Sequence, residues 1–126
     1  MAFARNNAVV QSATAGSGQV GQDATWVSIW DAATGGNRLK NIQITGDPDA
    51  LIQDARFQIP VNGLVFRQNA GTGETEEFAQ RGLRGRIDGG VWVQWHTGDP
   101  GANGTANIIA LARTQVAESG FNITNT

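Results

Sequence analysis

The chain has 126 residues, including 17 glycines, 3 prolines and no cysteine, and its formal net charge is −2. Its length fits one domain over residues 1–126, and glycine without a collagen period predicts tight turns between short strands rather than a fibre. The composition excludes disulfides and thiolate metal sites, gives no electrostatic footprint for nucleic acid, and contains no apolar run of the roughly 20 residues that a membrane helix needs.

The first third of the chain predicts an arm and two strands. Residues 8–21 are small and polar, so residues 1–21 are either an extended arm or an edge strand. Residues 25–30, Thr-Trp-Val-Ser-Ile-Trp, are β-branched and aromatic, which is typical of a strand. Turn residues follow at 31–37, and residues 39–45 alternate again until Gly46-Asp47-Pro48-Asp49 ends that strand.

The middle of the chain predicts a hairpin. Residues 55–61 alternate apolar and polar side chains, and Pro60 places them at a sheet edge or a strand end because it lacks an N–H. Asn62-Gly63 is the strongest hairpin-turn signal in the chain. We therefore expect residues 64–66 to form the return strand of that hairpin.

One short helix is predicted near residues 74–84. Thr72 or Thr75 can cap its first turn, and the glutamates that follow suit the helix dipole. Phe78 is its clearest apolar contact, with Leu83 near the end. Two glycines, at positions 82 and 85, are expected to end it.

The last third predicts a strong strand at residues 91–96, a long turn at 97–104 and closing strands within 108–116 and 121–123. About six to eight short strands and one helix indicate an all-β fold, a single-domain antiparallel β-sandwich of jelly-roll-like form. The expected core consists of Val27, Ile29, Ile42, Ile44, Phe57, Ile59, Leu64, Val91, Val93 and Ile109.

Candidate catalytic residues are sparse, since catalysis needs a convergent set of acid, base or nucleophile and the chain has one histidine, His96. His96 and Asp99 could form an acid/base or metal pair. An Asp before a proline more commonly bonds its own backbone in a turn, and glutamates at a helix start are dipole partners. We expect no enzymatic activity, no metal and no cofactor, and expect His96→Ala to leave folding and assembly nearly intact.

Seven residues are candidates for an interface or a binding site: Trp26, Trp30, Trp92, Trp95, Arg81, Arg84 and Arg86. The tryptophans occupy both faces of two predicted strands, so either both faces are covered or one face meets a partner. The arginines could hold an acidic partner subunit or a phosphate. A helix C-terminus also favours positive charge without any partner.

Several segments resemble a family of small tailed-phage virion proteins described as tail-fibre or minor structural proteins. The segments are Trp30-Asp31-Ala32-Ala33-Thr34-Gly35-Gly36-Asn37, Trp95-His96-Thr97-Gly98-Asp99-Pro100-Gly101, Leu111-Ala112-Arg113, Phe3-Ala4-Arg5, Asp54 to Leu64 and Glu76 to Leu83. The first of these is the most specific. The elements that close the fold in the family come first in this chain, which indicates a circular permutation or an exchange of terminal strands between subunits.

The resemblance implies a non-enzymatic virion structural protein, made in the host cytoplasm, whose partners are itself and other virion proteins. We expect a homotrimer that decorates or cements the capsid by binding the major capsid protein, because the chain is a short, complete domain without heptads or a stalk. Residues 8–21 would add a strand to a neighbour, would be mobile in the free subunit, and could be removed by deleting residues 1–21 without loss of folding. The alternative is a tail-fibre or tail-tip protein, such as a carbohydrate-binding module in which Trp30 or Trp92 stacks on a host glycan.

Overall fold

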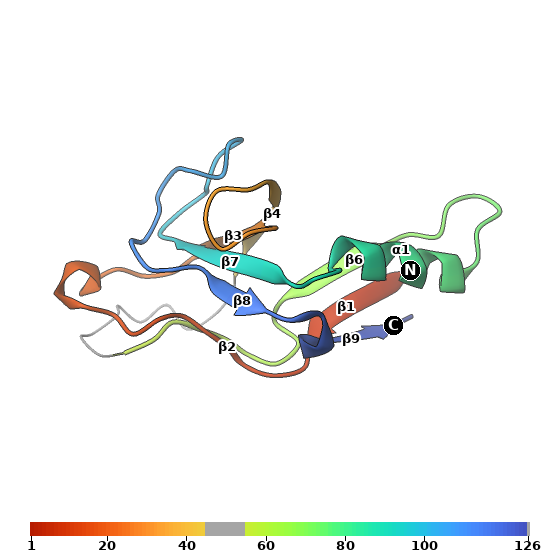
Figure 1. Ribbon diagram of the computed structural model, residues 1–126, viewed down its shortest axis with the longest axis horizontal. Helices are drawn as coiled ribbons and strands as arrows, with labels where there is room; N and C mark the ends of the chain where they lie inside the picture. The colour runs from red at the N-terminus through yellow and green to blue at the C-terminus, as the bar shows by residue number, and fades with distance from the viewer. Residues whose placement is uncertain (45–54, 126) are drawn as a thin grey trace.

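The computed structural model describes residues 1–44 and 55–125 (Figure 1). Most of their regular structure is β, in three antiparallel sheets, and α1 (Glu76–Arg86) is the α-helix among them, so the prediction of an all-β chain with one short helix is confirmed. The strands are β1 (Ala2–Asn6), β2 (Val10–Gln11), β3 (Trp26–Trp30), β4 (Arg38–Gln43), β5 (Gln58–Ile59), β6 (Val65–Gln68), β7 (Val91–His96), β8 (Thr114–Val116) and β9 (Phe121–Thr124). Two 3-10 turns lie at Ser17–Gln19 and Glu118–Gly120. The turn predicted at residues 46–49 lies outside the described residues.

A long two-stranded ribbon runs through the molecule, because residues 1–15 pair antiparallel with residues 55–68. β1 pairs with β6, and β2 pairs with β5. Backbone hydrogen bonds extend the pairing beyond these strands, from Ser12 N to Phe57 O at 2.9 Å and from Ala15 N to Ala55 O at 2.8 Å. β9 adds to the other edge of β1, which gives the order β6-β1-β9.

The expected hairpin is wrong. A turn does form at Asn62, which has a φ of 66°, but β5 and β6 do not pair with each other as a hairpin because each pairs with the N-terminal segment. Of the two alternatives for residues 1–21, the structure shows paired strands and not an arm, since β1 is a central strand, β2 pairs with β5, and Ala2 and Ala4 are fully buried. Deleting residues 1–21 would remove these strands, so the truncated chain is not expected to fold.

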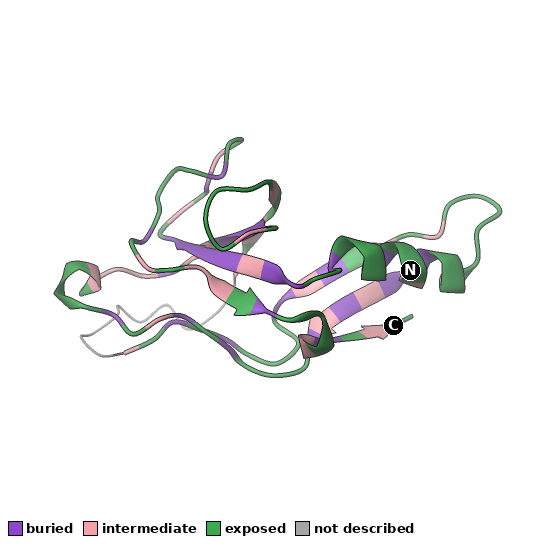
Figure 2. Cartoon of the chain, viewed as in Figure 1, coloured by how far each residue is buried: buried purple, intermediate pink, exposed green. Residues whose placement is uncertain are grey.

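The second large sheet has the order β4-β3-β7-β8. Its inner face is apolar: Val27 lies opposite Trp95, and Ile29 lies opposite Val93. This face packs on the ribbon, where the rings of Trp95 and Phe57 stack with centroids 5.9 Å apart. Figure 2 shows the burial that results along β7. The core of the molecule therefore lies between this sheet and the β2–β5 part of the ribbon.

Helix α1 covers the same face of the ribbon farther along, over β6-β1-β9 (Figure 1). Thr75, one of the two predicted caps, accepts a hydrogen bond from Phe78 N. Ala79 and Leu83, one turn apart, are the helix residues buried against the sheet. The expected core contact of Phe78 is wrong, since its side chain lies on another side of the helix and is 61% exposed.

Most of the predicted core is buried. The buried members are Val27, Ile29, Phe57, Ile59, Leu64, Val91, Val93 and Ile109. Ile42 and Ile44 are only partly buried against this core. β4 is an edge strand of its sheet, so its side chains keep more contact with solvent.

Candidate functional site

The four tryptophans lie on the adjacent strands β3 and β7 and divide between the two faces of the sheet. Trp95 points into the core and is fully buried. Trp26, Trp30 and Trp92 share the outer face with Ser28 and His96, because Trp26 lies opposite His96 and Trp30 opposite Trp92. Trp30 is buried, whereas Trp26 and Trp92 are half-buried.

The chain itself covers part of this outer face. The segment between β7 and β8 folds back over it, and the Gln94 side chain donates to the carbonyl of Ile109 at 3.2 Å. His96 contacts the carbonyl of Ala106 through Nδ1 at 2.7 Å. Both faces of the sheet are therefore covered over part of their area, and the half-buried rings of Trp26 and Trp92 mark where cover is incomplete.

A buried chain of hydrogen bonds joins Trp30, Ser28 and His96. Trp30 Nε1 donates to Ser28 Oγ at 2.7 Å, and Ser28 Oγ lies 2.7 Å from His96 Nε2. The Ala106 carbonyl can only accept, so Nδ1 of His96 carries the proton and Nε2 accepts from the Ser28 hydroxyl. The network thus fixes one neutral tautomer of the histidine.

This Ser28–His96 pair has the spacing of a nucleophile and its base, but its surroundings oppose catalysis. Both side chains are fully buried, and a backbone carbonyl takes the place that a carboxylate occupies in a catalytic triad. The Asp99 carboxylate instead accepts from Gly101 N at 2.9 Å, so the predicted backbone-bonded turn is confirmed. The arrangement suits a structural network that holds residues 97–108 on the sheet.

The sequence did not predict the hydrogen bonds among Trp30, Ser28 and His96, although one feature of the sequence points to them. Ser28 is the polar residue between two tryptophans on a strand, and such a residue needs a hydrogen-bond partner once its face is covered. His96 is brought to it by the register of β3 and β7. The expectation that His96→Ala leaves folding nearly intact is therefore revised: removal of the ring leaves the buried Ser28 hydroxyl without its acceptor, at a cost of about 1–3 kcal/mol.

We expect stability to fall as the pH is lowered from 7 to 5. Burial of the ring lowers the pKa of His96 below that of an unfolded histidine, about 6.5, and the hydrogen bond to Ala106 offsets this only in part. Below about pH 6.5, protons therefore bind preferentially to the unfolded chain. The contribution of neutral His96 to the free energy of unfolding is complete above that pH and is lost as the pH falls toward the pKa of the folded state. The slope is no more than about 1.4 kcal/mol per pH unit. Urea unfolding at a series of pH values measures it.

His96 is the chain's one histidine, so His96→Gln is a direct control for this pH dependence. The variant loses stability at pH 7 but should show a flatter profile between pH 7 and 5. Equal slopes in the variant and the parent would show that another group is responsible.

The turn after β3 is held together by its own side chains. Asp31 Oδ1 accepts from Asn37 N at 2.7 Å, and Oδ2 accepts from Asn37 Nδ2 at 2.9 Å; these bonds lower the pKa of Asp31 below its usual value. Gly36 has a φ of 75°, and a Cβ there would clash with the Asp31 carboxylate. Glycine is thus needed at this position on two grounds.

Arg113 closes this turn from the other side. Its Nη1 donates to the carbonyls of Ala32 at 2.9 Å and Gly35 at 2.8 Å, and its guanidinium lies 4.1 Å from the ring centroid of Trp30. A cation over a tryptophan face is a favourable arrangement. The turn at residues 30–37 and the Leu111-Ala112-Arg113 segment, which are far apart in the sequence, therefore form one locked unit.

The three candidate arginines lie on α1, away from the tryptophans. Arg81 pairs with Glu77 at 3.2 Å, and Arg84 lies 4.0 Å from the same carboxylate. Arg86 is exposed near the end of the helix. The structure therefore does not bring the arginine and tryptophan groups into one site.

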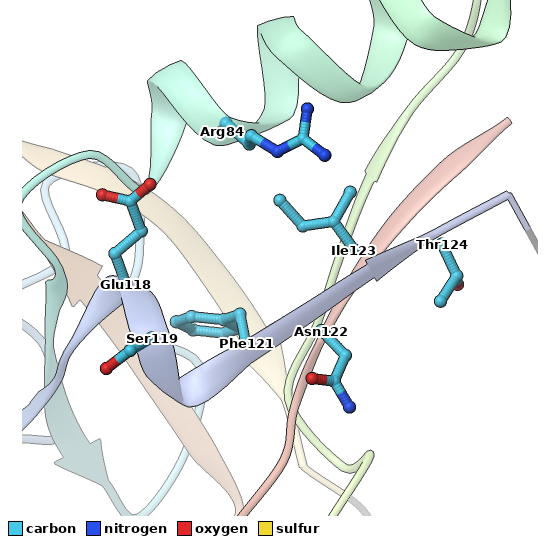
Figure 3. A pocket seen from close by; sticks show the side chains of 7 residues that line it. All are labelled: Arg84, Glu118, Ser119, Phe121, Asn122, Ile123 and Thr124. Carbon is cyan, nitrogen blue, oxygen red and sulfur yellow. The ribbon is translucent and has the colours of Figure 1, made fainter.

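An open groove of about 840 Å³ lies between the end of α1 and the outer edge of β9 (Figure 3). Its lining residues are Arg84, Glu118, Ser119, Phe121, Asn122, Ile123 and Thr124. Figure 3 shows the Arg84 side chain reaching from α1 toward Ile123, with Glu118 on the 3-10 turn that precedes β9. β9 is an edge strand, so the groove is suited to an extended polypeptide segment that adds to the sheet.

Neither a metal centre nor a membrane-spanning helix is found in the part of the chain that the structure describes. Across residues 1–44 and 55–125, no three His, Asp or Glu side chains gather where they could hold a metal ion, and no helix is long and apolar enough to cross a membrane. In comparisons with known proteins, no family model matches the chain, and no curated protein or solved structure is significantly similar to it.

Proposed function

We propose that the chain is a non-enzymatic structural component of a tailed-phage particle, which acts by packing against copies of itself and against other virion proteins. One observation carries the proposal: the turn at residues 30–37 is locked by Arg113. These are two of the segments that resemble the virion family, and they contact each other. Asp31, Asn37 and Arg113 bond within the chain, so the most family-like motif serves to hold a shape.

The same proposal includes a β-sandwich arrangement of the sheets and a permuted order of the elements. A sandwich would place the β4-β3-β7-β8 sheet as one layer and the β2–β5 ribbon as the other, which agrees with the stacking of Trp95 on Phe57. A permuted element order requires neighbouring chain ends. Phe3 lies opposite Thr124 in the pairing of β1 with β9, so this requirement is met.

Within the particle, we place the chain on the capsid as an oligomeric, trimeric decoration or cement protein that contacts the major capsid protein. The edge strands β4 and β9 support this role, because an edge can accept a strand from a neighbour. The alternative is a tail-fibre or tail-tip protein that binds a host glycan. Trp92 is its better anchor, since Arg113 already lies over one ring face of Trp30.

Gold-labelled protein added to virions of the encoding phage tests the location. We expect the label on the capsid shell, with saturation, and with the same binding after Trp92→Ala. Label confined to tail tips, together with glycan binding that Trp92→Ala abolishes, would instead support the receptor-binding alternative. Absence of label from both capsids and tails would contradict the proposal as a whole.

A further inference from the structure

One face of the ribbon carries arginines and no carboxylate among the residues that the structure describes. Alternation in β1 turns Ala2 and Ala4 toward α1, and turns Phe3 and Arg5 the other way. Arg67 lies opposite Phe3 in the pairing of β1 with β6. Farther along the ribbon, Arg56 lies on this same side, because the buried Phe57 next to it faces the core. We call this surface, which comprises Phe3, Arg5, Val9, Arg56, Val65 and Arg67, the back face.

The back face combines positive charge with apolar area. The guanidinium groups of Arg5 and Arg67 lie 4.4 and 5.8 Å from the ring centroid of Phe3. Val9 is 46% exposed, and Arg56 and Arg67 are also exposed. The chain has more acidic than basic residues, and its net charge is −2. Because the charged residues of the back face are all arginines, other surfaces of the molecule carry the excess of acidic residues.

The start of α1 carries an excess of carboxylates, although the Met1 ammonium pairs with Glu76 and Arg81 pairs with Glu77. Glu74 and Glu77 are exposed there, next to Phe78, whose 61% exposure is the largest of the exposed apolar side chains in the described residues. α1 packs on the face of the ribbon opposite to the back face (Figure 1). A chain therefore cannot place its own helix on its own back face.

We propose that the start of α1 in one copy, with Glu74, Glu77 and Phe78, packs on the back face of a second copy. The two surfaces are opposite in charge, and each carries exposed apolar area. The apolar share of the back face also favours a protein occupant over a polyanion that arginines alone would hold. Such a head-to-tail contact closes into a ring when the rotation permits. The proposal rests on the homo-oligomer in the proposed function and names its interface.

Sedimentation of the full chain tests the interface without any virion. The parent protein should self-associate, whereas Arg56→Glu with Arg67→Glu, or Glu74→Lys with Glu77→Lys, should each weaken association by about 100-fold, because like charges then face each other. An equimolar mixture of the two variants should restore association between unlike variants, since their altered surfaces are complementary again, whereas a closed ring of three would keep one contact between like charges. Circular dichroism checks that each variant remains folded.

Lys40→Glu with Arg86→Glu is the matched control, because it makes the same change in net charge at two exposed positions outside both surfaces. This control should associate like the parent. A monomeric parent, variants that associate normally, or a mixture that fails to restore association between unlike variants would each overturn the proposal. Loss of association in the control as well would show that net charge, and not the back face, governs association, which would also overturn it. Intact association together with unlabelled virions would contradict only the particle role.

Discussion

Replacing Trp95 by alanine should lower the free energy of unfolding by about 3–5 kcal/mol, the usual cost of removing a large buried aromatic side chain. The ring is fully buried, stacks on Phe57 and lies opposite Val27. Its Nε1 donates to Thr114 Oγ1 at 3.3 Å. Trp95 therefore joins the β4-β3-β7-β8 sheet to the ribbon, and its loss leaves a cavity at the contact between them. Urea unfolding followed by circular dichroism measures the change.

Trp92→Ala is the matched control for this experiment, because Trp92 lies on the same strand and on the opposite, half-exposed face. Its cost should be clearly smaller, about 1–2 kcal/mol, since less buried area is lost. Trp95→Phe keeps most of the ring volume and should remain folded if the alanine variant does not. Equal losses at Trp92 and Trp95 would show that the inner face of the sheet is not the main core.

Alternation in the sequence was enough to locate the strands with strong patterns. β7 spans the predicted residues 91–96, and β3 begins one residue after the predicted start. Period-two patterns identify which side chains share a face, but they do not identify the strand that pairs with each edge. The pairing of β1 with β6 joins residues at least 60 positions apart, and its pairing with β9 joins residues from nearly opposite ends of the chain, so no local signal specifies either.

The helix shows a second limit, which concerns the choice of the buried face. Phe78 is its largest apolar side chain, yet the buried residues are Ala79 and Leu83. Ile87, four residues farther on, continues the same line and is also buried. The buried face of the helix is therefore set by the apolar residues that recur every four positions, and not by the large side chain of Phe78.

The candidate site depended still more on tertiary structure. The sequence placed four tryptophans on two strands, but the contact of Ser28 with His96 requires the register of those strands. The hydrogen bond from Arg113 to the 31–37 turn requires the chain to return across the sheet after β7. Both contacts join residues far apart in the sequence. Patterns in a single sequence could therefore identify the residues but could not predict which of them contact each other.

Asn6→Ala should be the most damaging change to the ribbon, with an expected loss of roughly 2–4 kcal/mol. From Arg5, opposite Val65, to Val10, opposite Ile59, one strand advances by five positions and the other by six. Asn6 is fully buried at this mismatch, where its Oδ1 accepts from Leu64 N at 2.8 Å. Its Nδ2 donates to the carbonyls of Ala8 and Pro60, each at 2.9 Å. Alanine would remove these three hydrogen bonds and leave the Leu64 amide without its acceptor, while the Pro60 carbonyl keeps its hydrogen bond from Gly63 N.

Asn7→Ala separates this buried role from a general asparagine effect. Asn7 is exposed, and its Nδ2 also makes two hydrogen bonds, to Ser119 O at 2.9 Å and Asn122 Oδ1 at 3.3 Å. Water can replace these bonds, so the loss should stay near or below about 1 kcal/mol. Hydrogen exchange offers a local measurement. The Leu64 amide should exchange faster in the Asn6 variant than in the parent, whereas its exchange rate should be unchanged in the Asn7 variant. Similar unfolding free energies for both variants would mean that strand pairing alone, without the Asn6 side chain, holds the one-residue shift in the ribbon.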